Sequence, residues 1–270
     1  MALAIRQPAV AGRFYPRDPK ALLADVQSYL SPRQSPTTAL GCVVPHAGYM
    51  YSGHVAGAVF AKLEIPSRCI LMCPNHTGIG HPLAIMSEGL WQTPLGLVNI
   101  DHELAENLRR SFPGLEEDSG AHRAEHAAEV ELPFLQSLKP DITFVPIALG
   151  TGRYETLESL GTAIAEVISK QGERILILAS SDMNHYENDQ ITRIKDHKAI
   201  DQILALNPRG LYDVVMKEEI SMCGFGPTVA MLTAALSLGA TKAELIKYAT
   251  SGDVSGDHNM VVGYAGIIVS

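Results

Sequence analysis

The alternation of short apolar runs with segments of helical period is the feature that most limits how this chain can fold. Apolar runs of strand length occupy residues 39–44, 69–73, 142–149, 174–180, 243–250 and 261–269, and two more β segments are expected around Gly89 between residues 82 and 100. Helical patterns occupy 55–63, 101–110 with Asp101 as its cap, 125–138 with a break at Pro133, 154–170, 189–206, 208–217 and 226–238. Strands that alternate with crossover helices pair in a parallel sheet. The sequence therefore predicts an α/β fold with a largely parallel central sheet.

Length and charge exclude several classes of protein. A chain of 270 residues can bury one large core, so we treat 1–270 as a single domain. The formal net charge is −8, and no basic run with interleaved aromatic residues is present, which argues against binding to nucleic acid. The apolar runs are shorter than the roughly 20 residues that cross a bilayer, so no membrane association is expected. The N-terminus lacks the pattern of a signal peptide, and a cytoplasmic location is expected.

Four cysteines are expected to be reduced in such a compartment. Cys42, Cys69 and Cys73 lie inside predicted strands, where a cysteine usually acts as a small buried hydrophobic residue. Cys223 instead comes directly before a predicted helix, whose free amides and dipole stabilise a thiolate. Cys223 is therefore the cysteine best placed to act as a ligand.

Histidines follow three of the predicted strands at the point where each strand ends. His46 follows the strand at 39–44 in the sequence PHAGY, His76 follows the strand at 69–73 in PNH, and His185 follows the strand at 174–180 in SSDMNHY. In open α/β sheets, ligands bind at the carboxyl ends of the strands. We therefore expect these side chains to meet at one edge of the sheet and to form a site there.

Two neutral imidazoles at strand ends are a common beginning of a transition-metal site, because histidine binds iron, copper, nickel and zinc. A third ligand is required. Asp182 is one candidate, but it is equally suited to orient an imidazole or to cap its loop. Cys223 is the other candidate.

The segment EHAAEVE at 125–131 places His126 and Glu129 three residues apart, on one face of the predicted helix. Such a pair can bind a metal, but a polar wall or second shell of a pocket is the favoured interpretation, and a solvated helix N-terminus explains the pattern about as well. Tyr49, with other scattered aromatic residues, is a candidate for lining a cleft.

These motifs together resemble the Memo family, in particular its prokaryotic members, and more distantly the class III extradiol dioxygenases. The resemblance extends from the N-terminus to the last strands and rests on AVAGRFYP at 9–16, PHAGY at 45–49, PNH at 74–76, EHAAEVELPF at 125–134, SSDMNHY at 180–186, the Cys223-Gly224 turn and YATSGDVSGD at 248–257.

The resemblance implies a three-layer α/β/α sandwich like that of the extradiol dioxygenases. It also implies a redox-active metal, iron or copper, on His46, His76 and Cys223, with Asp182 and His185 lining the same pocket. The dioxygenases complete their iron site with a carboxylate, whereas a thiolate is expected here. A thiolate is softer, and it favours Cu(I), zinc or a thiolate-bound iron.

Three functions remain open at this stage. The first is a metal-dependent oxidoreductase in which His185, oriented by Asp182, moves a proton to or from a small-molecule or peptide substrate. The second is a metal-dependent hydrolase with Glu129 or His185 as the general base. The third is a non-catalytic module that binds a peptide or a small anion.

Overall fold

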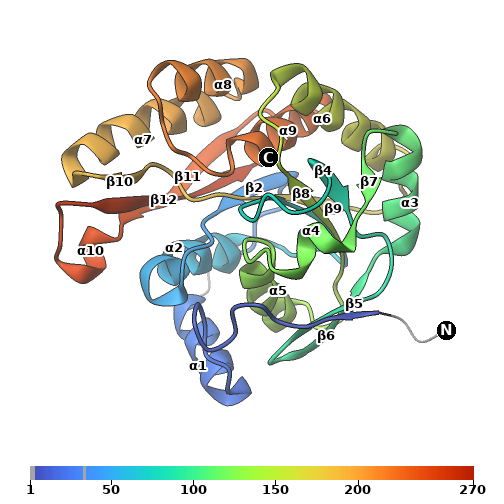
Figure 1. Cartoon of the computed structure of the whole chain (residues 1–270), viewed down its shortest axis with the longest axis horizontal. Helices are drawn as coiled ribbons and strands as arrows, with labels where there is room; N and C mark the ends of the chain where they lie inside the picture. Colours follow the sequence, from blue (N-terminus) through green and yellow to red (C-terminus); the bar gives the residue numbers. More distant parts are fainter. Residues whose placement is uncertain (1–3, 33–34) are drawn as a thin grey trace.

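The computed structural model describes residues 4–32 and 35–270, in which a mixed sheet of twelve strands forms the centre of the molecule (Figure 1). The strand order is β1-β5-β6-β8-β3-β9-β2-β12-β10; in addition, β11 pairs with β12, and β4 pairs with β7 and β8. The strands are β1 (Ile5–Arg6), β2 (Gly41–Val44), β3 (Arg68–Pro74), β4 (Leu83–Ile85), β5 (Leu90–Thr93), β6 (Gly96–Ile100), β7 (Glu116–Glu117), β8 (Thr143–Leu149), β9 (Ile175–Ser180), β10 (His185–Glu187), β11 (Ala243–Thr250) and β12 (Val261–Val269).

Helices connect and cover these strands. They are α1 (Pro19–Tyr29), α2 (Tyr49–Lys62), α3 (His102–Ser111), α4 (Ser119–Arg123), the short 3-10 helix η1 (Glu129–Glu131), α5 (Leu132–Leu138), α6 (Tyr154–Ile168), α7 (Asp189–Leu204), α8 (Pro208–Lys217), α9 (Phe225–Ser237) and α10 (Gly252–Ser255). Among the described residues, no helix combines the length and the apolar character that a membrane span requires.

The centre of the sheet is parallel, as the sequence predicts. Strands β6, β8, β3, β9 and β2 are neighbours in this order, and each runs parallel to the next. Antiparallel pairs are found outside this group, where β12 joins β2 and β5 joins β6. Parallel strands that are neighbours end at the same edge of a sheet, so the carboxyl ends of β3, β9 and β2 are brought together.

Helices on both faces of the sheet complete a three-layer α/β/α sandwich. Along β2, Cys42 and Val44 belong to one hydrophobic core and Val43 belongs to the other, because successive side chains of a strand point to opposite faces. Helices α1, α2 and α5 pack in the first core, whereas α3, α6, α7, α8 and α9 pack in the second. Figure 1 shows α1, α2 and α5 gathered on one side of the strands and α6 to α9 on the other. The α/β fold class is therefore confirmed.

The segment 125–138 departs from the continuous helix that its pattern predicts. Residues 125–128 are not helical, η1 covers 129–131, and a regular helix begins only at Leu132. The cause lies in Glu125, whose carboxylate accepts hydrogen bonds from the backbone amides of His126 and Ala127. A side chain that binds neighbouring amides in this way competes with the helix.

The N-terminal third contains more helix than the pattern indicates. Helix α1 was not predicted, and α2 begins at Tyr49, six residues before the expected start. The two helices lie so close that a Cβ atom added at Gly57 would be 2.5 Å from the carbonyl oxygen of Tyr29. A glycine at this position of α2 therefore serves close packing rather than a turn. The region 82–100 also differs, since it holds three strands instead of two.

Asp196, in α7, is a buried carboxyl group outside the candidate site. Its Oδ1 accepts a hydrogen bond from the Asn184 amide at 2.8 Å, and its Oδ2 accepts one from the Tyr248 hydroxyl at 2.7 Å. Burial outweighs these two bonds and raises the pKa of Asp196 to about 7. The folded chain therefore holds a proton that the unfolded chain releases near pH 4.

We predict that Asp196→Asn flattens the dependence of stability on pH. In the native protein the unfolding free energy should fall as the pH rises from about 4 to 7, because only the unfolded state loses the proton in this window; the loss approaches about 4 kcal/mol. Urea denaturation of both proteins across this range measures the difference. Asp201→Asn, an exposed change in the same helix, serves as the control. Parallel curves for Asp196→Asn and the native protein would contradict the prediction.

Candidate metal site

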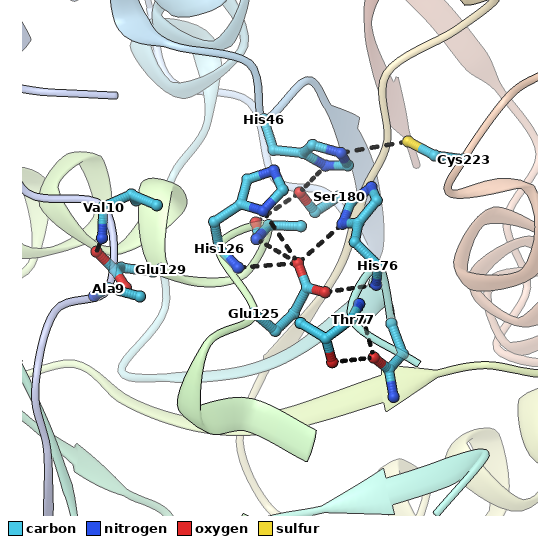
Figure 2. Close-up of polar contacts among 12 residues, drawn as sticks. Ala9, Val10, His46, His76, Thr77, Glu125, His126, Glu129, Ser180 and Cys223 are labelled. Atoms are coloured by element: carbon cyan, nitrogen blue, oxygen red, sulfur yellow. Dashed lines mark hydrogen bonds and ion pairs between the residues drawn. The ribbon is translucent and has the colours of Figure 1, made fainter. Parts of the chain in front are cut away.

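The ends of two parallel strands and the start of one helix bring the predicted ligands together. His46 follows β2 by two residues, His76 follows β3 by two residues, and Cys223 lies just before α9. One ligand atom from each of these three side chains lies within 4.8 Å of the other two. Figure 2 shows the imidazoles of His46 and His76 close together, with the sulfur of Cys223 beside His46. The structure thus places the three residues as the sequence analysis expects.

His46 is held from both sides. Its Nδ1 lies 2.8 Å from the hydroxyl oxygen of Ser180, and its Nε2 lies 3.2 Å from Sγ of Cys223. Its backbone amide donates to Oδ1 of Asp182 at 2.8 Å. Burial, with a contribution from His76, lowers the pKa of His46 well below its usual value, so the imidazole is neutral. A neutral imidazole is the form that binds a metal.

His76 is oriented by Glu125, a residue to which the sequence analysis gave no role. Glu125 accepts from Nδ1 of His76 at 2.9 Å and from the backbone amide of His76. Burial opposes the charge of Glu125, but the hydrogen bond from His76 and the neighbouring amides outweigh it and lower the pKa of Glu125 to about 2. The ionised carboxylate fixes the proton of His76 on Nδ1, so Nε2 is free. This arrangement matches the carboxylate–histidine pairs that support metal ligands.

Cys223 reaches the site because its neighbour is a glycine. A Cβ atom at Gly224 would lie 2.4 Å from the carbonyl oxygen of Ser180 and 2.4 Å from Cβ of Ser181. The Gly224 amide instead donates to the hydroxyl of Ser181 at 3.0 Å. This bond fixes the turn before α9 against the end of β9. Burial, together with Asp182, raises the pKa of the Cys223 thiol well above its usual value, so the sulfur carries its proton when no metal is present.

A second group of candidate ligands, His76, Glu125 and His126, overlaps the first. The carboxylate of Glu125 already accepts from the amides of His76, His126 and Ala127 and from the His76 ring. A metal would have to displace these bonds. His126 stacks on His76 with ring centroids 4.7 Å apart, and burial lowers its pKa to about 4. His126 therefore contributes a neutral ring to the wall of the site, and the first group is the better metal site.

The three ligand candidates open into a pocket of about 500 Å³, lined by Phe14, His46, Ala47, Gly48, His76, His126, Asp182, His185, Tyr186, Ser221, Cys223 and Val262. Asp182 and His185 lie in this lining, but they are not hydrogen-bonded to each other. Nδ1 of His185 is 2.8 Å from the carbonyl oxygen of Ser221, which can only accept. The proton of a neutral His185 ring is therefore on Nδ1. Ser221, rather than Asp182, orients this imidazole.

Two predicted pocket residues lie elsewhere. Tyr49 is buried, and its hydroxyl donates to the carbonyl oxygen of Val130 at 2.6 Å. Glu129 points away from the imidazoles toward Ala9 and Val10 (Figure 2), where it pairs with Arg6 and accepts from two backbone amides. The helical spacing that linked Glu129 to His126 does not apply, because the chain is not helical at residues 125–128. Neither residue contributes to the pocket lining.

Comparisons with known proteins identify the family. The profile described as "Memo-like protein" matches residues 6–268. The chain belongs to the Memo-like family. A MEMO1 family protein of Methanosarcina barkeri is 46% identical over 267 residues, which cover 98% of this chain and all of the relative. A MEMO1 family protein of Methanothermobacter thermautotrophicus is 41% identical over 273 residues, which cover 97% of this chain and 99% of the relative. The resemblance to the Memo family is thereby confirmed.

A solved structure supports the fold alone. The crystal structure of an uncharacterized protein from Escherichia coli K12 has a TM-score of 0.58 and 12% sequence identity, and it covers 84% of this chain and 98% of its own. At this level of identity, the likeness indicates a shared α/β architecture and nothing about the chemistry.

We predict that Glu125→Ala strongly destabilises the fold. The change leaves the amides of His76, His126 and Ala127 without their acceptor, and buried unsatisfied donors should together cost about 3 kcal/mol or more. Glu125→Gln retains one oxygen acceptor and should cost less. Chemical denaturation of both variants tests the order, with the exposed change Glu166→Ala as the control. Equal stability of Glu125→Ala and the native protein would exclude the proposed bonding.

Tyr186, at the rim of the pocket, has a φ of +59° although it is not a glycine, and its side chain is 68% exposed. A left-handed backbone costs a residue with a Cβ about 1 kcal/mol. We therefore predict that Tyr186→Gly is more stable than Tyr186→Ala by about 1 kcal/mol, the reverse of the usual order in strands. Thermal and urea unfolding of the two variants provide the measurement. A more stable alanine variant would show that the backbone at this position is not strained.

Proposed function

We propose that this chain binds a redox-active transition metal, iron or copper, through His46, His76 and Cys223, and that it is a metal-dependent oxidoreductase. The proposal rests on one observation: three ligand atoms from segments far apart in the sequence lie within 4.8 Å of one another. The lining of the adjoining pocket, which includes Phe14, Tyr186 and Val262, leaves room for a small substrate.

The distances suit a single ion. Nitrogen and sulfur ligands at about 2.0 Å and 2.3 Å from a tetrahedral metal are about 3.5 Å apart. The separation of 3.2 Å between His46 Nε2 and Cys223 Sγ is close to that value. Nδ1 of each imidazole already has a partner in Ser180 or Glu125, so Nε2 is the nitrogen available to the metal. This spacing and the free Nε2 atoms support one ion held by the three side chains.

The ligand types are compatible with a redox-active metal. Two imidazoles and a soft thiolate suit Cu(I), zinc or a thiolate-bound iron, and three protein ligands leave a coordination position free. When bound, such a metal would exchange electrons with the substrate or with O2 and polarise the group it holds. Zinc would support hydrolysis instead.

The surrounding side chains would accept and donate protons during the reaction. Nε2 of His185 is unbound, since Nδ1 donates to Ser221, and His185 is partly exposed in the pocket. It can therefore accept a proton from a substrate and return it. Asp182 is buried, which raises its pKa, and its Oδ1 holds the backbone of His46. Its role is to fix His46 and to place a carboxyl group beside the substrate.

We predict that protein prepared without oxygen and without added metal contains close to one equivalent of iron or copper. Cys223→Ala, His46→Ala and His76→Ala should each reduce the bound metal at least tenfold, because each removes one of three ligands. Cys69→Ala, a buried change in β3, and His197→Ala, on the surface of α7, should retain the metal. Elemental analysis measures the content, and circular dichroism shows that each variant is folded.

Two results would contradict the proposal. Full metal content in folded Cys223→Ala would show that the Cys223 thiolate is not a ligand. Stoichiometric zinc in colourless native protein would exclude redox chemistry and favour the hydrolase, for which His185 is the remaining base because Glu129 lies outside the pocket.

A further inference from the structure

Ser180, the last residue of β9, connects His46 to the buried acid Glu131. Its hydroxyl oxygen lies 2.8 Å from Nδ1 of His46, 2.8 Å from the carbonyl oxygen of Ala127 and 3.0 Å from Oε1 of Glu131. Ser180 and Glu131 are both completely buried. The Ser180 hydroxyl and the Glu131 carboxyl group are therefore shielded from bulk solvent.

The number of protons determines how these contacts are made. A hydroxyl group has one proton to donate and two lone pairs to accept with. The carbonyl oxygen of Ala127 can only accept, so the Ser180 proton must point to it if all three contacts are hydrogen bonds. The other two neighbours must then donate. This requires a proton on Nδ1 of His46 and a proton on Oε1 of Glu131.

The surroundings of Glu131 agree with a neutral acid. No cationic side chain lies within ion-pair distance of its carboxyl group in the described part of the chain, and its Oε2 has no hydrogen-bond partner there. An ionised carboxylate in such a place would lack the partners that buried charges require. Burial, and to a smaller extent Asp182, raises the pKa of Glu131 well above its usual value.

We propose that Glu131 is a positioning residue: as a neutral carboxylic acid it donates a hydrogen bond to Ser180, and it thereby fixes His46 with its proton on Nδ1 and with Nε2 free to bind the metal. Without this donor, the Ser180 hydroxyl can rotate and donate to Nδ1 instead. The proton of His46 would then be on Nε2, which could no longer act as a ligand. The consequence for metal binding rests on the proposed function, but the protonation of Glu131 and the tautomer of His46 do not.

Two spectroscopic measurements on metal-free protein test the inference directly. Infrared spectroscopy should detect the carbonyl stretch of one buried protonated carboxyl group that disappears in Glu131→Gln. The matched control is Glu129→Gln, another buried glutamate, which pairs with Arg6 and should leave this band in place. Nitrogen-15 NMR of histidine-labelled protein, assigned with His46→Ala, should show Nδ1 of His46 protonated and Nε2 bare.

Substitutions separate positioning from a merely structural role. Glu131→Leu removes the donor, so the NMR signals of His46 should shift toward the tautomer with the proton on Nε2. Glu131→Gln can donate from its amide nitrogen and should restore the native tautomer. In a titration with Co²⁺, Glu131→Leu should weaken binding roughly tenfold, as removal of an outer-shell partner does, and Glu131→Gln should remain close to the native protein. Ser180→Ala combined with Glu131→Leu should bind no more weakly than Ser180→Ala alone, because Glu131 acts through Ser180.

The outcomes distinguish this inference from the proposed function. Native protein that binds no metal but shows the expected carboxyl band and tautomer would refute the metal site and leave the role of Glu131 intact. A bare Nδ1 in native His46, or the absence of a carboxyl band that depends on Glu131, would overturn the inference even if the metal binds. If Glu131→Leu does not fold, the infrared band and the native tautomer still decide.

Discussion

The parallel pairing of β3, β9 and β2 is the constraint on which the candidate site depends. These three strands are neighbours, and their carboxyl ends lie at one edge of the sheet. His46 and His76 each follow their strand by two residues. The path of the backbone alone therefore places both candidate ligands at the same edge of the sheet. A shift of one strand by a single residue would turn its buried side chains to the opposite face. The two hydrophobic cores on either side of the sheet therefore fix the register, and with it the positions of the histidines.

Buried oxygen atoms then set the direction of each imidazole. Glu125 holds Nδ1 of His76, and Ser180 holds Nδ1 of His46, so both rings present the same nitrogen to the space between them. These oxygens come from different parts of the chain. Ser180 ends a strand, whereas Glu125 lies in a non-helical segment, and its carboxylate accepts hydrogen bonds from three backbone amides. Orientation of the ligands and local backbone structure are thus maintained by the same hydrogen bonds.

Sequence and structure agree where a side chain follows a well-defined strand, and they disagree at residues 125–128, where the expected helix does not form. The positions of His46, His76 and Cys223 could be predicted because a strand end or a helix start gives a residue a definite place in an α/β fold. The pairing of His126 with Glu129 could not, since it relied on helical spacing in a segment where Glu125 disrupts the helix. The contribution of Ser221 had no signal in the sequence, because it acts through a backbone carbonyl that any residue possesses.

The sequence by itself determined the α/β class, the parallel centre of the sheet and the edge at which reactive side chains gather, because hydrophobic periodicity and strand ends are local properties of the chain. The tertiary structure alone decided which polar atoms meet: that Glu129 faces Arg6, that Tyr49 is bonded to Val130, and that Ser180 lies between His46 and Glu131. Such contacts join residues many positions apart. Each depends on the angle between the two groups and on differences of a few tenths of an ångström in their separation. Those distances are set by the packing of whole elements, which residue spacing along the chain does not specify.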